Sequence, residues 1–114
     1  MNHIDTDLIS QNMFDDQALI KQFVSMYLIQ TPVDLDHLRN AIAAGDLQNI
    51  ADAAHHIKPT MDYIGAFHLK AKFETLETAA KNSESLEGLR AAFEVLDIEM
   101  KELIFELEQY EKTI

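Results

Sequence analysis

Apolar residues recur every three or four positions along most of the chain, which is the spacing that gives an α-helix one apolar face. No segment shows the convincing alternation of apolar and polar residues that marks a half-buried strand. The pattern predicts a short element over about residues 5–13, then helices over about residues 15–30, 31–45, 46–64, 66–81 and 86–110. The side chains expected to face the core include Ile20, Phe23, Tyr27, Leu35, Leu38, Ile42, Ile50, Ala54, Ile57, Leu69, Phe73, Leu76, Leu89, Phe93, Leu96, Met100, Leu103 and Leu107.

Residues typical of helix ends divide this pattern. Thr31 followed by Pro32 and Asp34 predicts a fresh helix start, with Thr31 as the N-cap and Asp34 completing a capping box. Gly45 predicts the end of that helix, and Asp46 is placed to cap the next one.

The length of 114 residues suits one domain with one modest core. Short loops between apolar stripes bring antiparallel helices side by side. We therefore expect a single all-α domain over residues 1–114, with its core between about residues 8 and 110. The expected architecture is an up-down antiparallel four-helix bundle with an additional short helix at the N-terminus.

The composition excludes several classes of function. Because the chain has no cysteine, it offers no disulfide, thiolate metal site or thiol nucleophile. Gly45, Gly65 and Gly88 lie too far apart for a glycine-rich phosphate-binding loop, so a nucleotide-binding kinase or a Rossmann enzyme is not expected. The formal net charge of −11 repels nucleic-acid backbones, which favours proteins or small ions as partners and argues against nucleic acid.

The N-terminus and the apolar runs bear on location. No apolar run approaches the roughly 18 residues of a membrane span. The segment Met1–Asp7 carries two acids and neither lysine nor arginine, unlike a signal peptide. We expect a cytoplasmic protein without a membrane partner.

The candidate chemistry centres on a histidine in the middle of a predicted helix. At about 100° per residue, Ala54 and Ile57 define the core seam, and His55 lies one step away from it. An imidazole at such a boundary is held by the bundle and still reaches solvent. Lys58 and Asp52, three residues to either side, should lie on the same side of the helix. The Lys58 ammonium could therefore balance the charge of a phosphoryl group bound to His55.

Pro59 should disturb this helix next to the histidine. Proline lacks the N–H that would bond the carbonyl four residues back, which is the carbonyl of His55. The helix is therefore expected to bend or loosen there and to open the groove above the imidazole. The alternative is that the helix ends early and that residues 60–65 form a loop.

This region closely resembles the signature of the histidine-phosphotransfer (HPt) family. The matching residues are Ala54-His55-His56-Ile57-Lys58, Ile64-Gly65-Ala66 with its glycine ten positions after the histidine, Leu69, and Leu76-Glu77. Upstream, Gln30-Thr31-Pro32 and Ala44-Gly45-Asp46 are also similar to this family. The resemblance extends over roughly residues 8–110, and the spacing fits without gaps.

The resemblance implies a role for each matched residue. His55 would be the phospho-acceptor, Lys58 would contact the phosphoryl oxygens, and Glu77 would hydrogen-bond the imidazole from the neighbouring helix. A glutamate that accepts from Nδ1–H would fix the tautomer and leave Nε2 as the nucleophile. Pro59 departs from the family, which usually has a small glycine there, so access must come from the bend. Asp62 and Tyr63 stand where small residues are common, which would narrow the range of partners.

The same resemblance implies a phosphoryl carrier rather than an enzyme. The partners would be response-regulator receiver domains, with a hybrid sensor histidine kinase as a further candidate. The receiver would supply Mg²⁺, so this chain is expected to bind no cofactor, metal or nucleotide, and to be a monomer. An adaptor that binds receivers without carrying phosphate is the main alternative, and the retention of both His55 and Lys58 argues against it. A plain helical scaffold would make the whole motif a coincidence.

Other residues could carry the site instead. His56 is the rival acceptor, although its position in the pattern disfavours it. His37 and His68 are expected at exposed helix positions and His3 in a loose end, without assigned roles.

A metal site and a docking surface are weaker hypotheses. Asp52-x-x-His55 and Glu74-x-x-Glu77 would suit a metal only poorly, because di-metal bundles need paired Glu-x-x-His motifs. Leu8, Met13 and Phe14 are candidates for a docking surface near His55, or for packing against the end of the bundle.

Overall fold

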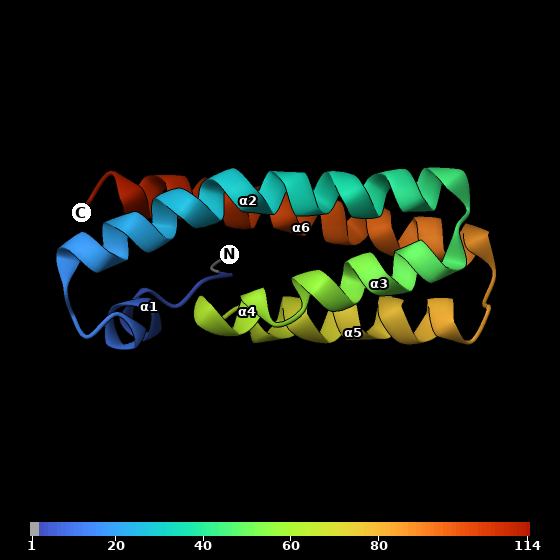
Figure 1. Cartoon of the computed structure of the whole chain (residues 1–114), viewed down its shortest axis with the longest axis horizontal. Helices are drawn as coiled ribbons and strands as arrows, with labels where there is room; N and C mark the ends of the chain where they lie inside the picture. Colours follow the sequence, from blue (N-terminus) through green and yellow to red (C-terminus); the bar gives the residue numbers. More distant parts are fainter. Residues whose placement is uncertain (1–2) are drawn as a thin grey trace.

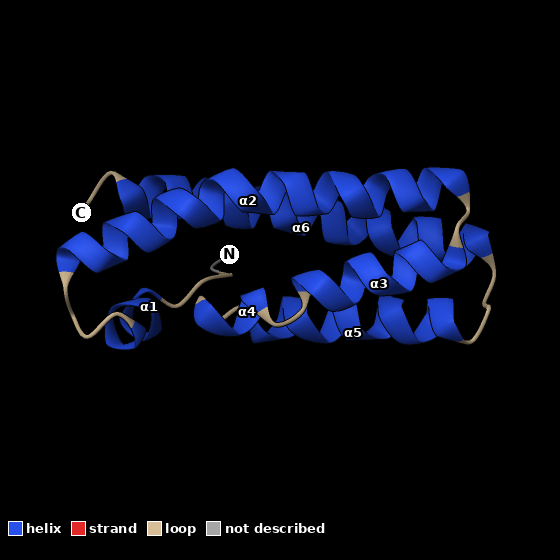
Figure 2. Ribbon diagram, viewed as in Figure 1, coloured by secondary structure: helices blue, strands red, loops and turns tan. Residues whose placement is uncertain are grey.

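The computed structural model describes residues 3–114, and every regular element among them is a helix (Figure 2). These are α1 (Thr6–Asn12), α2 (Gln17–Ala44), α3 (Leu47–Ile57), α4 (Thr60–Tyr63), α5 (Phe67–Lys81) and α6 (Leu86–Glu111). The expectation of an all-α protein is confirmed. Within residues 3–114, no helix is both long and apolar enough to cross a membrane.

The longer helices α2, α3, α5 and α6 lie side by side along the long axis of a molecule of 44 × 23 × 18 Å (Figure 1). Helix α3 packs against α2 and α5, and α6 packs against the same two helices. The short helices α1 and α4 contact each other at one end of the molecule. The core lies between the four long helices, where Leu38, Phe73 and Leu103 are fully buried. This arrangement places one face of α3 against α5, which matters for the site described below.

Side-chain caps begin most of the long helices. The carboxylate of Asp46 accepts the backbone N–H of Asn49 at 3.2 Å at the start of α3, as the sequence predicts. Asp16 and Ser85 cap α2 and α6 in the same way. Each such cap stabilises a helix by about 1 kcal/mol. Gly45 ends α2 in the left-handed conformation with φ of 67°, which confirms that boundary.

The predicted helix start at Thr31 is wrong, because α2 continues through Pro32 to Ala44. Thr31 is buried within the helix rather than capping it. Asp34 accepts a hydrogen bond from the side chain of Gln30 at 2.9 Å instead of closing a capping box.

The packing of α2 explains why the proline does not break it. Val24, Tyr27, Leu35 and Leu38, on both sides of Pro32, are buried in the same core. Burial of one such side chain contributes about 1.5–3 kcal/mol. The loss of helix propensity at a proline costs about 3 kcal/mol, so burial along one continuous helix outweighs it.

At Pro59, unlike at Pro32, the helix is interrupted. The single helix predicted over residues 46–64 is wrong, because α3 ends at Ile57 and α4 begins at Thr60. The interruption falls at Lys58 and Pro59, where the missing N–H predicts it. The hydroxyl of Thr60 donates to the carbonyl of Ile57 at 2.6 Å and so satisfies one freed acceptor. The alternative that the helix ends early is confirmed, but the loop it placed over residues 60–65 is wrong, since residues 60–63 are helical.

The N-terminal segment packs onto this end of the molecule. The N–H of Asp5 donates to the carbonyl of Ile64 at 2.8 Å. Gly65 permits this approach, since its φ is +73° and a Cβ there would lie 2.7 Å from the Cβ of Asp5. The expectation that His3 belongs to a loose end is wrong, because this residue is only 2% exposed. His37 and His68 are exposed, as expected.

Candidate functional site

His55 occupies the boundary position that helical periodicity predicts. Its neighbours Ala54 and Ile57 are fully buried in the core, whereas the His55 side chain is 67% exposed. The ring turns toward α5, where its Nδ1 lies 2.9 Å from Oε2 of Glu77. The structure therefore brings together the histidine and the glutamate that the sequence singled out.

Glu77 is a buried carboxylate that three side chains share. Besides His55, Nζ of Lys58 lies 3.0 Å from its Oε1, and Nζ of Lys81 lies 2.9 Å from its Oε2. Burial raises the pKa of Glu77, but the hydrogen bonds from Lys81 and Lys58 outweigh burial and lower that pKa from 4.5 to about 2. The same contact with Glu77 raises the pKa of Lys58. Glu77 and Lys58 are therefore both ionised at neutral pH.

The ionised carboxylate decides the tautomer of His55. A carboxylate can only accept hydrogen bonds, so Nδ1 of His55 must carry the proton that it shares with Glu77. In the neutral ring, Nε2 then keeps its lone pair, and the exposed side chain allows another molecule to approach it. This arrangement produces a nucleophilic nitrogen whose orientation is held by its neighbour.

The charges around the ring favour an anionic group. One carboxylate and two ammonium groups give the His55 cluster, defined here as His55, Lys58, Glu77 and Lys81, a local charge of about +1. The protein as a whole carries a formal charge of −11. The two ammonium groups of the cluster can thus balance charge on an anionic group at Nε2, while the carboxylate of Glu74 also acts on Lys58 and offsets part of their positive charge.

The sequence model of the Hpt domain family matches residues 22–109, most of the chain. The protein belongs to the Hpt domain family. Its function is accordingly histidine phosphotransfer within a phosphorelay, a role in which proteins of this family carry phosphoryl groups between response-regulator receivers and kinases. No curated protein matches the sequence.

A solved structure shares the fold of this Hpt protein. It is that of histidine-containing phosphotransfer protein B (HptB) from Pseudomonas aeruginosa PAO1, with a TM-score of 0.87 and 21% sequence identity. The match covers 98% of this chain and 96% of the other. At this identity the likeness shows the fold, and the site has to be argued from the residues of this chain.

The other histidine of the motif has a different environment in this Hpt domain. The side chain of His56 is also 67% exposed, but its Nε2 lies 3.5 Å from Asp34 of α2. Asp52, expected beside His55, accepts a hydrogen bond from Gln48 and lines a groove between α2 and α3 together with His56. Neither His56 nor Asp52 is part of the His55 cluster.

Lys81 is the member of the cluster that sequence analysis missed. It stands four residues after Glu77 on α5, and a glutamate followed by a lysine at this spacing commonly pairs on a helix. That signal could have identified it. The contact between Lys58 and a phosphoryl group stays a prediction. In this structure the Lys58 ammonium hydrogen-bonds Glu77, so it would have to turn to reach a phosphoryl group.

The remaining candidates divide between exposed and packed positions. Pro59 is exposed at the junction of α3 and α4. Phe14 is 84% exposed, whereas Met13 packs against the core and Leu8 is half-buried. Within residues 3–114, the group with metal-ligating geometry includes neither Asp52 with His55 nor Glu74 with Glu77.

Proposed function

We propose that His55 is the phospho-acceptor of this Hpt domain. Nε2 attacks the phosphorus of an aspartyl phosphate on a receiver domain, the P–N bond forms, and the bond to the aspartate oxygen breaks. A second receiver reverses the step. The observation that carries the proposal is the hydrogen bond of 2.9 Å from Nδ1 to the buried Glu77, combined with the exposure of the ring. When phosphorylation places positive charge on the imidazole, the Glu77 carboxylate stabilises it.

Lys58 would supply the contact to the phosphoryl oxygens. An ammonium has three donors, and the hydrogen bond to Glu77 uses one of them. Lys81 stays paired with Glu77 when Lys58 turns toward the phosphoryl group, so the carboxylate is not left alone. Lys58→Ala should slow transfer by about tenfold, the loss of one charge-assisted hydrogen bond, and Lys81→Ala should slow it less.

The transfer would need no cofactor on this chain. Positioning and charge supply most of the catalysis of phosphoryl transfer, and the acidic pocket and Mg²⁺ would belong to the receiver. The chain would thus act as a carrier without a kinase or nucleotide site. Its partners would be receiver domains and a hybrid sensor histidine kinase, and it would work as a cytoplasmic monomer.

The architecture inferred for this function is an up-down antiparallel bundle of α2, α3, α5 and α6 in a single domain over residues 1–114. The side-by-side packing of these helices and the short connections at Gly45–Asp46 and at residues 82–85 support it.

Access and docking follow from the same geometry. The interruption of the helix at Pro59 would keep the groove beside the ring open for a receiver. Phe14, the most exposed of the large apolar residues, would contribute to the docking surface. Leu8 and Met13, which are partly buried, would support it by packing.

The test uses a receiver domain carrying labelled phosphate. The wild type should acquire a label that survives alkali but not acid, and His55→Gln should acquire none. His56→Gln is the matched control, because the two side chains are equally exposed at 67%. Loss of the label in His56→Gln alone would show that the acceptor is misassigned. Receiver binding without any label in the wild type would indicate an adaptor. The absence of both receiver binding and label would indicate a scaffold.

A further inference from the structure

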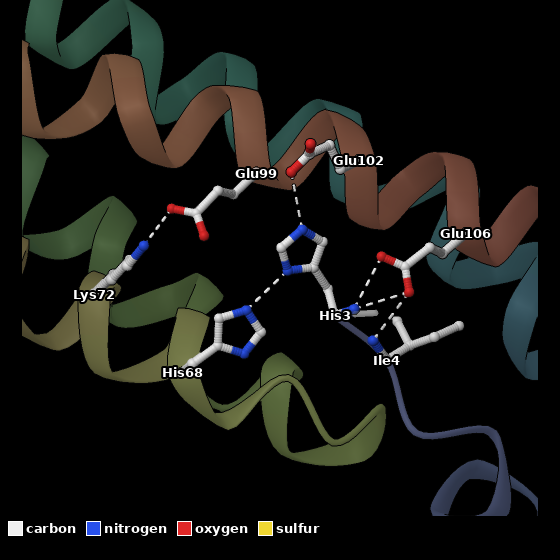
Figure 3. Close-up of polar contacts among 7 residues, drawn as sticks. All are labelled: His3, Ile4, His68, Lys72, Glu99, Glu102 and Glu106. Carbon is white, nitrogen blue, oxygen red and sulfur yellow. Dashed lines mark hydrogen bonds and ion pairs between the residues drawn. The ribbon is translucent and has the colours of Figure 1, made fainter. Parts of the chain in front are cut away.

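The N-terminal segment contacts α5 and α6 through a second group of histidines and glutamates (Figure 3). The backbone N–H of His3 donates to both carboxylate oxygens of Glu106, at 2.8 and 2.9 Å, and that of Ile4 donates to one of them at 3.4 Å. The side chain of His3 is completely buried. A residue so close to the chain end is rarely held by this many contacts.

Both ring nitrogens of His3 have a partner. Its Nδ1 lies 2.8 Å from Nε2 of His68 on α5, and its Nε2 lies 3.0 Å from Oε1 of Glu102 on α6. Glu99, one turn before Glu102, points to the same space and is paired with Lys72 (Figure 3). We call His3, His68, Glu99 and Glu102 the N-terminal histidine cluster.

We propose that His3, His68 and Glu99 bind a divalent transition-metal ion, for which Zn²⁺ fits best. One ring nitrogen of each histidine and a carboxylate oxygen of Glu99 all lie within 4.8 Å of one another, and Nδ1 of His3 and Nε2 of His68 are the nitrogens that face each other. Two imidazoles and one carboxylate form a common protein ligand set for zinc, with water in the fourth position. Because His68 is exposed, the ion and that water can reach the site from solvent. This proposal departs from the expectation that the chain binds no metal.

Two of the three ligands, His68 and Glu99, must move for the arrangement to accept the ion. Zn–N bonds of about 2.0–2.1 Å in a tetrahedron place two ligand nitrogens about 3.3 Å apart. The two imidazole nitrogens are 2.8 Å apart, so the exposed His68 must shift by about half an ångström. Glu99 must also turn away from Lys72.

Glu102 supplies the support that a ligating histidine commonly has. A histidine that binds a metal through one nitrogen usually donates the other N–H to a carboxylate, which fixes the tautomer and the ring orientation. The contact of Nε2 of His3 with Glu102 has this form and directs the lone pair of Nδ1 toward His68 and Glu99. Here Glu102 acts as a positioning residue, since it does not touch the ion.

The ion would join three segments that are distant in the sequence. It would link residue 3 to α5 and α6, next to Glu99, Glu102 and Glu106, whose negative charges it would reduce. Metal binding that requires the folded arrangement stabilises the fold. His68 and Glu77 are nine residues apart on α5, or about 13 Å along the helix axis, so the metal site would be separate from the His55 cluster.

The test is a titration of the untagged, metal-free chain with Zn²⁺ alone, followed by calorimetry and by thermal unfolding. The wild type should bind one ion per chain and unfold at a higher temperature with Zn²⁺. His68→Gln should weaken binding by more than about 100-fold, and Glu102→Ala by about 10- to 100-fold. Lys72→Met should strengthen binding, because it releases Glu99 and removes a positive charge.

The control is His37→Gln, which removes an exposed histidine of α2 and should leave zinc affinity unchanged. X-ray absorption at the zinc edge should show two imidazole ligands in the wild type and one in His68→Gln. Equal affinity of His68→Gln and wild type, or equal losses in His68→Gln and His37→Gln, would overturn the proposal. His55→Gln should bind zinc normally, so this test and the phosphotransfer test can fail independently.

Discussion

Two histidines in this protein are paired with glutamates, but burial is distributed in opposite ways. In the His55 cluster the ring is exposed and the carboxylate is buried: 67% of the His55 side chain is accessible, against 6% of Glu77. In the N-terminal histidine cluster the ring is buried and the carboxylate is exposed: none of the His3 side chain is accessible, against 54% of Glu102.

The difference separates a reactive imidazole from a structural one. Buried Glu77 keeps its charge, fixes the proton on Nδ1, and leaves Nε2 of His55 open to another protein. His3 has neighbours at both ring nitrogens and is enclosed by its own chain, so no receiver can reach it. Pairing with a glutamate does not by itself decide the role of a histidine; the burial of the ring and of its partner distinguishes the two cases.

The largest expected effect on phosphoryl transfer comes from removing Glu77, and removing Glu102 is the matched comparison. Glu77→Ala should slow phosphoryl transfer by about 100-fold or more, because His55 loses its orientation and its tautomer control. Glu102→Ala should transfer at the wild-type rate. Single-turnover transfer from a phosphorylated receiver measures both variants, and an equal slowing of the two would contradict the distinction between the clusters.

The second prediction concerns acid. The pKa of Glu77 lies at about 2 in the folded protein, below its ordinary value of 4.5. Its ionised form therefore stabilises the fold fully above about pH 4.5, and this stabilisation is lost as the pH falls toward 2. Between pH 6 and pH 3, the free energy of unfolding of the wild type should decrease by about 2 kcal/mol more than that of Glu77→Gln. Urea unfolding at each pH measures this difference, and parallel curves would contradict it.

The third prediction compares the two histidines by their effect on stability, where the buried one should matter more. His3→Ala, in chelator-treated buffer, should lower the free energy of unfolding by about 1–2 kcal/mol, because it removes a completely buried imidazole together with its two hydrogen bonds. His55→Ala should change it by less than about 0.5 kcal/mol, since the exposed ring leaves Glu77 with two lysines. Denaturant unfolding measures both values. A larger loss in His55→Ala would show that the His55 cluster is mainly structural.

Three members of the His55 cluster, His55, Lys58 and Glu77, could be predicted from local spacing and from the family motif, whereas Lys81 was missed. Helical spacing places Lys58 near His55, and the resemblance to the HPt family implies that Glu77 meets the imidazole from the facing helix. The surroundings of His3 could not be predicted in this way, because its partners lie 65 and 99 residues further along the chain. No periodicity connects such positions; only the packing of the N-terminal segment on α5 and α6 does.

The helix boundaries show where local signals stop being sufficient. Thr31 and Pro32 carry a clear helix-start signal, yet α2 continues because its two halves pack into one core. Pro59 does interrupt the helix, at a place where the hydroxyl of Thr60 donates to the carbonyl of Ile57 that the interruption leaves free. A proline thus predicts a loss of helix stability at its position, and tertiary packing decides whether the helix ends there.

The smallest expected effect tests that contrast at the site itself. Pro59→Ala restores an N–H four residues after His55, which allows α3 to extend and draws Lys58 out of its present position beside Glu77. Transfer should therefore slow by a few-fold. Pro32→Ala makes the same chemical change in α2, beside α6, and should leave transfer unchanged while stabilising the helix. If both variants transfer at the wild-type rate, the interruption at Pro59 has no part in access, and the exposure of His55 alone accounts for the reactivity of the ring.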